Sequence, residues 1–399
     1  MTRMLFKAFE DRRGEAVRVA VVDDSLFIRR ALARLLDGEP GIELVGTASR
    51  GEELLSNLLR WRPDLIILDL AMPGIGGLAT LEEIVIRRPT PVIVLSDTPR
   101  RSALLAVEAL HRGAVDCVEK RDLSLVDFQT LRETLVGRIR ELGARRYVDP
   151  FCAETPWEPP LAVSVADRSN PLCPPALLLL GASAGGPPAI ERVLHDLGPR
   201  PSIPVVVAQH MPPGFTRAFA SRLTAYLPIE VREAVDGEPL LPGRVYVAPG
   251  GIHTTVQMRA CGLRAVLTAT ADRVQPSIDN LFSSAASTLG PRAAAALLTG
   301  MGEDGAQGMA ALALAGAYTI AQDETTSVVF GMPRAAIAAG AVRETLPLSA
   351  IGSRLRQLAA RPRGNVPAFE GAWEPEPERG ALPSRGRAST IPPSRTVGQ

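Results

Sequence analysis

The chain has 399 residues, a length typical of two or three domains, and 46% of them are hydrophobic, as in globular proteins. The 44 lysines and arginines nearly balance the 43 aspartates and glutamates, so no overall basic surplus favours nucleic-acid binding. The four cysteines form no CxxC pair, which excludes a disulfide framework and argues against a zinc site.

No segment has the length and hydrophobicity of a membrane span. The longest apolar run covers the seven residues 309–315, whereas a membrane helix needs roughly 20 residues. Charged residues are scattered through 1–15, where a secretory signal would have an apolar stretch. We therefore expect a cytoplasmic protein that does not insert into a membrane.

Two proline-rich segments divide the chain. Seven prolines occur in 143–175 and seven more in 361–399, without a helical or alternating apolar pattern, which is typical of extended or disordered chain. The expected organisation is an N-terminal extension, a first folded block, a proline-rich linker, a second folded block and a disordered tail, over 1–16, 17–142, 143–175, 176–358 and 359–399.

Alternating strands and helices predict an α/β fold for the first block. We count five strands and five helices, which is the pattern of a doubly wound parallel sheet. Apolar runs indicate strands over 17–22, 42–48, 65–70, 91–96 and 115–120. Helical spacing gives bounds for four of the five helices, 25–36, 52–61, 102–112 and 128–142.

The second block repeats this pattern with more strands. Strands are expected over 176–183, 204–210, 243–250, 263–269, 293–301 and 317–323, with a helix over 187–197 and further helices between the later strands. The predicted fold class is therefore α/β, with two doubly wound parallel-sheet domains of which the second is larger.

Carboxylates directly follow two strands of the first block. Asp23 and Asp24 come after the first predicted strand, and Asp69 lies at the end of the third. Because the carboxyl ends of parallel strands share one edge of the sheet, the three carboxylates should meet there. Three carboxylates at one place require either a cation or raised pKa values, and Mg²⁺ bound by oxygen ligands is the natural solution.

This predicted edge is suited to phosphoryl chemistry. A metal that neutralises Asp24 and Asp69 would let Asp69 attack a phosphoryl donor. Ser96 and Lys120 end the next two strands, and a hydroxyl and an ammonium there could bind phosphoryl oxygens.

The segments VVDDS and LDLAMPG, together with Ser96 and Lys120, resemble the receiver domain of bacterial two-component response regulators. The resemblance covers about 17–142 and implies a flavodoxin-like fold in which a sensor histidine kinase phosphorylates Asp69. It also implies Mg²⁺ bound by Asp24, Asp69 and the Ala71 carbonyl, with Asp23 acting through water.

Three residues depart from the receiver pattern. Gly76 stands where an aspartate is usual, Arg121 replaces the proline that normally follows the lysine, and Cys117 occupies the position of a common aromatic switch residue. These departures concern the switching details rather than the phosphoacceptor.

A serine lies on a predicted strand-to-helix turn at the start of the second block. Gly-Ala-Ser183-Ala-Gly satisfies the GxSxG pattern of a nucleophile elbow, which exposes a hydroxyl beside the free N–H groups of a helix start. The segment does not match the GxGxxG motif of a dinucleotide-binding loop, because Ser183 occupies the position of the second glycine.

A base and an acid also follow predicted strands of this block. His210 ends the strand 204–210, and Glu303 and Asp304 follow the strand 293–301. A serine, a histidine and an acid at one sheet edge would form a catalytic triad, although local pattern does not choose between the two acids. The order Ser, His, acid also differs from the Ser, acid, His order of α/β-hydrolases.

Three other histidines compete with His210. His111 and His195 lie in helical stretches, and His253 follows a glycine-containing loop from which it could touch a substrate. The strand-end position favours His210.

The segments GASAGG, AQHMP, LTGMGEDGAQGM and VVFGMP resemble the chemotaxis protein-glutamate methylesterase (CheB) family over about 176–350. The resemblance implies a Rossmann-like catalytic domain with Ser183 as nucleophile, His210 as base, Asp304 as acid and the Met301 backbone N–H as an oxyanion donor. One departure is Ala184, where the family usually has a threonine hydroxyl.

The implied activity is that of a phosphorylation-regulated serine hydrolase in chemotaxis adaptation. It would demethylate glutamate methyl esters, and deamidate glutamines, on the cytoplasmic helices of methyl-accepting chemoreceptors, with no cofactor for the esterase step. Backbone N–H groups near Met301 and Ser183 would stabilise the oxyanion, and the receiver would cover the catalytic cleft until it is phosphorylated. Two alternatives stay open, a two-component regulator with a general carboxylesterase output and a catalytically weak scaffold that binds receptors.

Overall fold

The computed structural model describes residues 9–11, 15–96, 100–120, 128–143, 145–147, 173–270 and 274–360. The segment 361–399 of the predicted tail and most of the predicted linker lie outside these ranges, as does Arg121.

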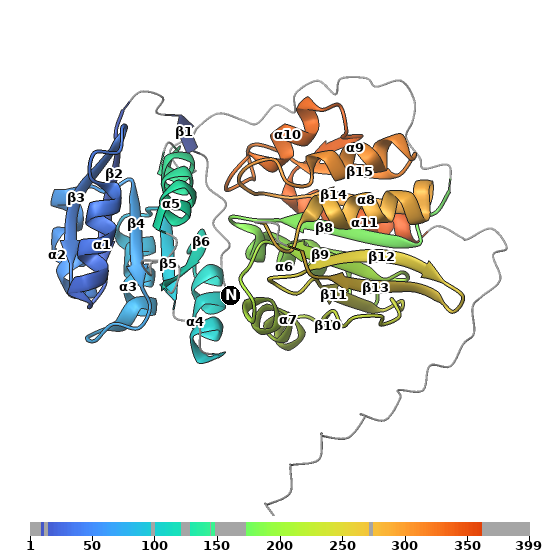
Figure 1. Ribbon diagram of the computed structural model, residues 1–399, viewed down its shortest axis with the longest axis horizontal. Helices are drawn as coiled ribbons and strands as arrows, with labels where there is room; N and C mark the ends of the chain where they lie inside the picture. Colours follow the sequence, from blue (N-terminus) through green and yellow to red (C-terminus); the bar gives the residue numbers. More distant parts are fainter. Residues whose placement is uncertain are drawn as a thin grey trace, which may run out of the picture. The chain divides into compact units, whose positions relative to one another are not determined.

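The first sheet has five parallel strands in the order β3-β2-β4-β5-β6 (Figure 1). Its strands are β2 (Val17–Val22), β3 (Ile42–Ala48), β4 (Leu65–Asp69), β5 (Val92–Ser96) and β6 (Asp116–Glu119). The accompanying helices are α1 (Leu26–Leu36), α2 (Gly51–Trp61), α3 (Gly76–Arg87), α4 (Arg100–His111) and α5 (Phe128–Gly143). The parallel sheet confirms the predicted fold of this block, and α3 is the fifth helix, for which the sequence pattern sets no bounds.

Successive side chains of β2 face opposite sides of this sheet, as the period of a strand requires. Val19 and Val21 pack with residues of α1 and α5, whereas Ala20 and Val22 pack with residues of α2, α3 and α4. Helices therefore cover both faces, which is the doubly wound arrangement.

The second sheet has seven parallel strands in the order β10-β11-β9-β8-β14-β15-β16 (Figure 1). Its strands are β8 (Leu177–Ala182), β9 (Val205–Gln209), β10 (Glu230–Glu233), β11 (Arg244–Val247), β14 (Ala293–Leu297), β15 (Tyr318–Gln322) and β16 (Glu344–Leu346). The helices are α6 (Gly186–Leu197), α7 (Phe215–Tyr226), α8 (Ile278–Leu289), α9 (Ala306–Leu314), α10 (Met332–Ala338) and α11 (Leu348–Ala359), and a 3-10 turn, η3 (Gly290–Arg292), precedes β14.

Helices also cover both faces of this larger sheet. Leu178 and Leu180 of β8 pack with residues of α6, α7 and α11, whereas Leu177 and Leu179 pack with residues of α8, α9 and α10. The second domain is therefore also doubly wound and larger than the first, as predicted.

Some strands of this block differ from the sequence prediction. The strand expected over 263–269 is β13 (Gly262–Thr268), which pairs antiparallel with β12 (His253–Arg259) outside the parallel sheet. The pattern did not indicate β12, nor the edge strands β10 and β16. Both edge strands are short and carry acidic residues, so they lack the apolar run of a central strand.

A short antiparallel pair joins β1 (Phe9–Asp11) to β7 (Arg145–Tyr147). Its residues belong to the predicted N-terminal extension and linker, where no element was expected.

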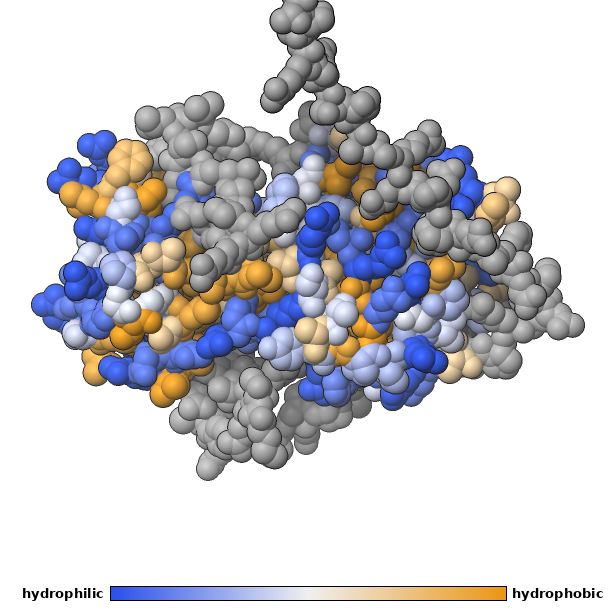
Figure 2. Space-filling model, turned by 90° about the horizontal axis from the view of Figure 1, so that it is seen from below, coloured by the Kyte–Doolittle hydropathy of each residue, from blue (hydrophilic) through white to orange (hydrophobic). Residues whose placement is uncertain are grey.

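Among the described helices, none is long and apolar enough to cross a membrane. On the face shown in Figure 2, hydrophobic and hydrophilic residues are interspersed. The exposed large apolar side chains include Phe27, Ile86 and Leu314, and scattered residues of this kind are normal on a protein surface.

Candidate active site and phosphoacceptor site

Three neighbouring strands bring Ser183, His210 and Asp304 to one edge of the larger sheet. Ser183 follows β8, His210 follows β9, and Asp304 lies in the loop after β14. These strands are adjacent in the order β9-β8-β14 and run parallel. Their carboxyl ends therefore lie side by side, where ligands of open α/β sheets bind.

A hydrogen bond joins the predicted base to the predicted acid. His210 Nε2 lies 2.7 Å from Asp304 Oδ2, and the two side chains are only 19% and 17% exposed. Burial raises the pKa of Asp304, but its hydrogen bonds to His210 and to the N–H groups of Ile278 and Asp279 lower it to about 2. Asp304 is thus a carboxylate at neutral pH, which suits the orientation of an imidazole.

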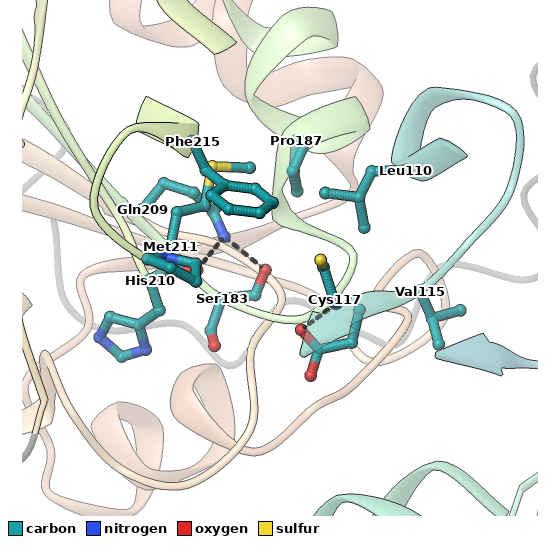
Figure 3. A pocket seen from close by; sticks show the side chains of 11 residues that line it. Leu110, Val115, Cys117, Ser183, Pro187, Gln209, His210, Met211 and Phe215 are labelled. Atoms are coloured by element: carbon teal, nitrogen blue, oxygen red, sulfur yellow. Dashed lines mark hydrogen bonds between the residues drawn. The ribbon is translucent and has the colours of Figure 1, made fainter. Parts of the chain in front are cut away.

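Ser183 and His210 line the same small pocket, together with Gln209, Met211 and Phe215 (Figure 3). Within the described residues Ser183 Oγ and His210 form no hydrogen bond. Nucleophile–base hydrogen bonds are often long before substrate binds, so the pocket geometry is compatible with the predicted pair.

The backbone N–H groups around Ser183 decide where an oxyanion could bind. The N–H of Ser183 donates to the Thr299 carbonyl at 3.0 Å and is therefore engaged. Among the described residues, the N–H groups of Ala184 and Met301 have no protein acceptor. A Cβ on Gly300 would lie 2.9 Å from Ser183 Cβ, so the peptide that carries the Met301 N–H passes directly beside the serine.

Gln209 is a site residue that the sequence pattern did not indicate. Its buried side chain donates from Nε2 to the carbonyl oxygens of Ser183 at 2.9 Å and His210 at 3.2 Å (Figure 3). One amide thus joins the backbone of the serine turn to the backbone of the histidine. The only signal for it was a polar residue at the end of an apolar strand.

A hydroxyl reaches the serine turn even though Ala184 has none. Thr299 Oγ1 donates to the Ala184 carbonyl and accepts from the Val329 N–H, both at 2.9 Å. Thr299 therefore holds the backbone at the departure from the family pattern.

The other candidate residues lie elsewhere. His111 Nε2 pairs with Glu191, and His195 is exposed and contacts its neighbour Asp196. His253 is buried and accepts the N–H of Ser277 on Nδ1 at 3.1 Å. Glu303 is exposed, whereas Asp304 contacts His210.

Asp23, Asp24 and Asp69 meet at the carboxyl edge of the five-stranded sheet. Each offers a carboxylate oxygen, and these oxygens lie within 4.8 Å of one another. Burial raises the pKa of Asp23, a hydrogen bond from Lys120 opposes this effect, and the Asp69 charge adds to it. A set of oxygen donors whose charges repel one another fits Mg²⁺.

Lys120 contacts Asp69, and Ser96 lies at the end of the neighbouring strand β5. Lys120 Nζ lies 3.0 Å from Asp23 Oδ2 and 2.8 Å from Asp69 Oδ2. Ser96 is buried at the end of β5 next to β4. Ala71, whose carbonyl is the fourth predicted metal ligand, donates its N–H to Asp69 Oδ1 at 3.1 Å.

The structure shows the environment of two residues that depart from the receiver pattern, Gly76 and Cys117. Gly76 has a φ of 77°, a left-handed conformation that glycine adopts without strain. Cys117 is buried, and burial raises the pKa of its thiol, so it stays protonated and unreactive.

Two family models match the chain. One, described as CheB methylesterase, covers 178–355, and the other, described as response regulator receiver domain, covers 19–132. The solved catalytic domain of Thermotoga maritima CheB methylesterase is 36% identical, covers 46% of this chain and 98% of that chain, and has a TM-score of 0.45.

Curated relatives match over most of both lengths. The protein-glutamate methylesterase/protein-glutamine glutaminase of a Nocardioides species is 41% identical over 88% of this chain and 98% of its own. The protein-glutamate methylesterase/protein-glutamine glutaminase 1 of Myxococcus xanthus is 42% identical over 87% of this chain and 98% of its own. The chain therefore belongs to the CheB family, in which a receiver domain precedes a methylesterase domain.

Proposed function

We propose that this protein is a protein-glutamate methylesterase that hydrolyses glutamate methyl esters on the cytoplasmic helices of methyl-accepting chemoreceptors and deamidates glutamines there. The observation that carries the proposal is the 2.7 Å hydrogen bond between His210 and Asp304 at the pocket that Ser183 lines. A hydroxyl, an imidazole and a carboxylate in this arrangement perform acyl transfer on unrelated folds.

Ser183 acts as the nucleophile. His210 takes the Ser183 hydroxyl proton as Oγ attacks the ester carbonyl carbon, and Asp304 stabilises the imidazolium that forms. The tetrahedral intermediate expels methanol, which receives its proton from His210. Water, activated by His210, then hydrolyses the acyl-enzyme and leaves a free glutamate side chain.

The oxyanion binds to the N–H groups of Ala184 and Met301. Both flank Ser183, and neither has an acceptor among the described residues. Each such donor typically raises kcat by a factor of about 10²–10³. A glutamine amide forms the same kind of intermediate and expels ammonia in place of methanol.

The receiver accepts a phosphoryl group on Asp69 from a sensor histidine kinase. Asp23, Asp24, Asp69 and the Ala71 carbonyl would hold Mg²⁺, which offsets the charge of the acceptor and the phosphoryl oxygens. Lys120 and Ser96 would contact the transferred group.

Receiver residues also reach the serine turn. The Val115 carbonyl accepts the N–H of Gly185 at 2.9 Å, and Leu110 and Cys117 line the pocket with Ser183 (Figure 3). Val115 precedes β6, and Lys120, which contacts Asp69, follows it. A phosphoryl group on Asp69 changes the partners of Lys120, and this shifts the equilibrium toward an arrangement that opens the pocket.

The substrate class is tested with the full chain and two substrates. We expect methanol release from methylated chemoreceptor membranes, accelerated by a phosphodonor with Mg²⁺, and slower turnover of a small aryl ester. Equal preference for both substrates would instead favour a general carboxylesterase. Receptor binding without hydrolysis of either would favour a scaffold.

A further inference from the structure

His253 is a buried histidine that the proposed reaction does not use. It begins β12, where it pairs with Thr268 of β13, and its side chain is 1% exposed. Its Nδ1 accepts the backbone N–H of Ser277 at 3.1 Å. Because an N–H points at this nitrogen, Nδ1 acts as a hydrogen-bond acceptor.

Ser277 is in turn the N-cap of α8. Its Oγ accepts the N–H of Asn280 at 3.2 Å and donates to Asp304 Oδ1 at 3.0 Å. A hydroxyl has one proton and two lone pairs, so both hydrogen bonds form together. The residue that starts the helix thus also contacts the predicted catalytic acid.

The first turn of α8 completes a cradle around the same carboxylate. The N–H of Ile278 donates to Asp304 Oδ2 at 2.8 Å, and the N–H of Asp279 donates to Asp304 Oδ1 at 3.0 Å. Helix α8 has 12 residues, and the partial positive charge of its N-terminus favours an anion there. With His210 on Oδ2, both oxygens of Asp304 have fixed partners.

A second carboxyl group, that of Asp279, interacts with the carboxyl of Asp304. Asp279 Oδ1 also accepts the Gly308 N–H at 2.6 Å. Burial raises the pKa of Asp279, and the charge of Asp304 adds to this effect. The hydrogen-bond donors on both oxygens of Asp304 oppose the repulsion between the two carboxyl groups.

We propose that Ser277 and His253 are positioning residues for the His210–Asp304 pair. His253 orients the Ser277 peptide, and the Ser277 hydroxyl with the first N–H groups of α8 holds Asp304 so that Oδ2 meets His210. This inference rests on the proposed function, since it assigns a role only if Asp304 acts on His210 during ester hydrolysis.

The test uses the full-length protein and methanol release from methylated receptor membranes. Ser277→Gly removes the hydroxyl. Glycine is preferred to alanine for this variant, because glycine at an N-cap costs much less helix stability than alanine does. We expect its kcat to fall roughly 10- to 100-fold with KM within about twofold, because small misplacement of a catalytic group has effects of this size. Ser277→Thr, which retains the hydroxyl, restores kcat.

Variants at His253 test the same proposal independently. His253→Leu removes the acceptor for the Ser277 N–H and lowers kcat in the same way, whereas His253→Asn, whose amide oxygen can accept that N–H, recovers activity. Ser284→Ala is the matched control, because Ser284 lies in α8 and contacts β12 through the Val256 N–H but does not contact Asp304. Its kcat stays at the wild-type value.

Ser183→Ala separates failure of this inference from failure of the proposed function. If Ser183→Ala is inactive while Ser277→Gly and His253→Leu keep the wild-type kcat, the positioning role is wrong and the function stands. A rise in KM without a change in kcat would also contradict it, because the two residues would then act on substrate binding. Full activity of Ser183→Ala would overturn the function and this inference together.

Discussion

Asp304 receives its hydrogen bond from Nε2 of His210, so Nδ1 is the nitrogen left to accept the proton of Ser183. In the chymotrypsin triad the two nitrogens have the opposite roles. The carboxylate therefore selects the tautomer with the proton on Nε2, and the chemistry depends on this choice.

Replacing Asp304 with asparagine should remove that selection. We expect Asp304→Asn to lower kcat by about 10³–10⁴, because an amide stabilises the wrong tautomer and does not stabilise the imidazolium. Steady-state methanol release measures this effect. Glu303→Gln is the matched control, since Glu303 is the exposed neighbour, and its kcat should stay within about twofold. A larger loss in Glu303→Gln would show that the acid is misassigned.

The low pKa of Asp304 predicts how stability depends on pH. The pKa in the folded protein, about 2, lies below the ordinary value of 3.8. The ionised carboxylate therefore stabilises the fold above about pH 4, and this contribution is lost as the pH falls toward 2. The melting temperature of Asp304→Asn should lie below that of the wild type at pH 7, and the difference should shrink between pH 4 and pH 2. A constant difference across this range would contradict the assignment.

Ion pairs between α4 and α7 predict an effect on basal activity. Arg222 of α7 pairs with Glu108 of α4, and the two side chains are 16% and 28% exposed. Arg222→Ala removes the Glu108 partner that comes from α7, while Arg112, directly after α4, still pairs with Glu108 at 2.8 Å. The contact between the two helices is therefore weakened, and a change of about 1.4 kcal/mol shifts an equilibrium tenfold. Arg222→Ala should raise unphosphorylated esterase activity several-fold and leave the phosphorylated rate unchanged.

Arg217→Ala is the control for this interface. Arg217 lies on the same helix and pairs with Glu233 of β10, so its loss should leave basal activity at the wild-type level. Equal activation by both variants would mean that the α4 contact does not restrain the enzyme.

The receiver assignment predicts which carboxylate is phosphorylated. Incubation with a radiolabelled phosphodonor and Mg²⁺ should label the wild type and Asp37→Asn, a variant at an exposed aspartate outside the cluster. Asp69→Asn should take up no label, and chelation of Mg²⁺ should prevent labelling of the wild type. Label on Asp69→Asn would place the acceptor elsewhere.

Sequence periodicity predicted the central strands of both sheets because they are buried on both faces and read as apolar runs. The edge strands β10 and β16 were missed because one side of each has no neighbouring strand and their sequences, EVRE and ETL, are partly polar. The β12 strand was missed because it pairs outside the parallel sheet, where a continuous apolar run is not required.

The strand-end positions of Ser183, His210 and Asp304 predicted that they share one sheet edge, since parallel topology places such ends together. The groups that hold them could not be predicted in this way. Ser277 precedes Asp304 by 27 residues and contacts it only after α8 packs against the loop. The role of Gln209 could not be predicted either, because the hydrogen bonds from its amide to two carbonyl groups depend on tertiary structure rather than on local sequence pattern.

Methanol release from radiolabelled methylated receptor membranes by wild type and Ser183→Ala, each with and without a phosphodonor, tests the role of Ser183 most directly. We expect the wild type to release methanol, and to do so faster with the phosphodonor. The rate of Ser183→Ala should be at least about 10³-fold lower in both conditions. Release by Ser183→Ala at a rate close to that of the wild type would contradict this role.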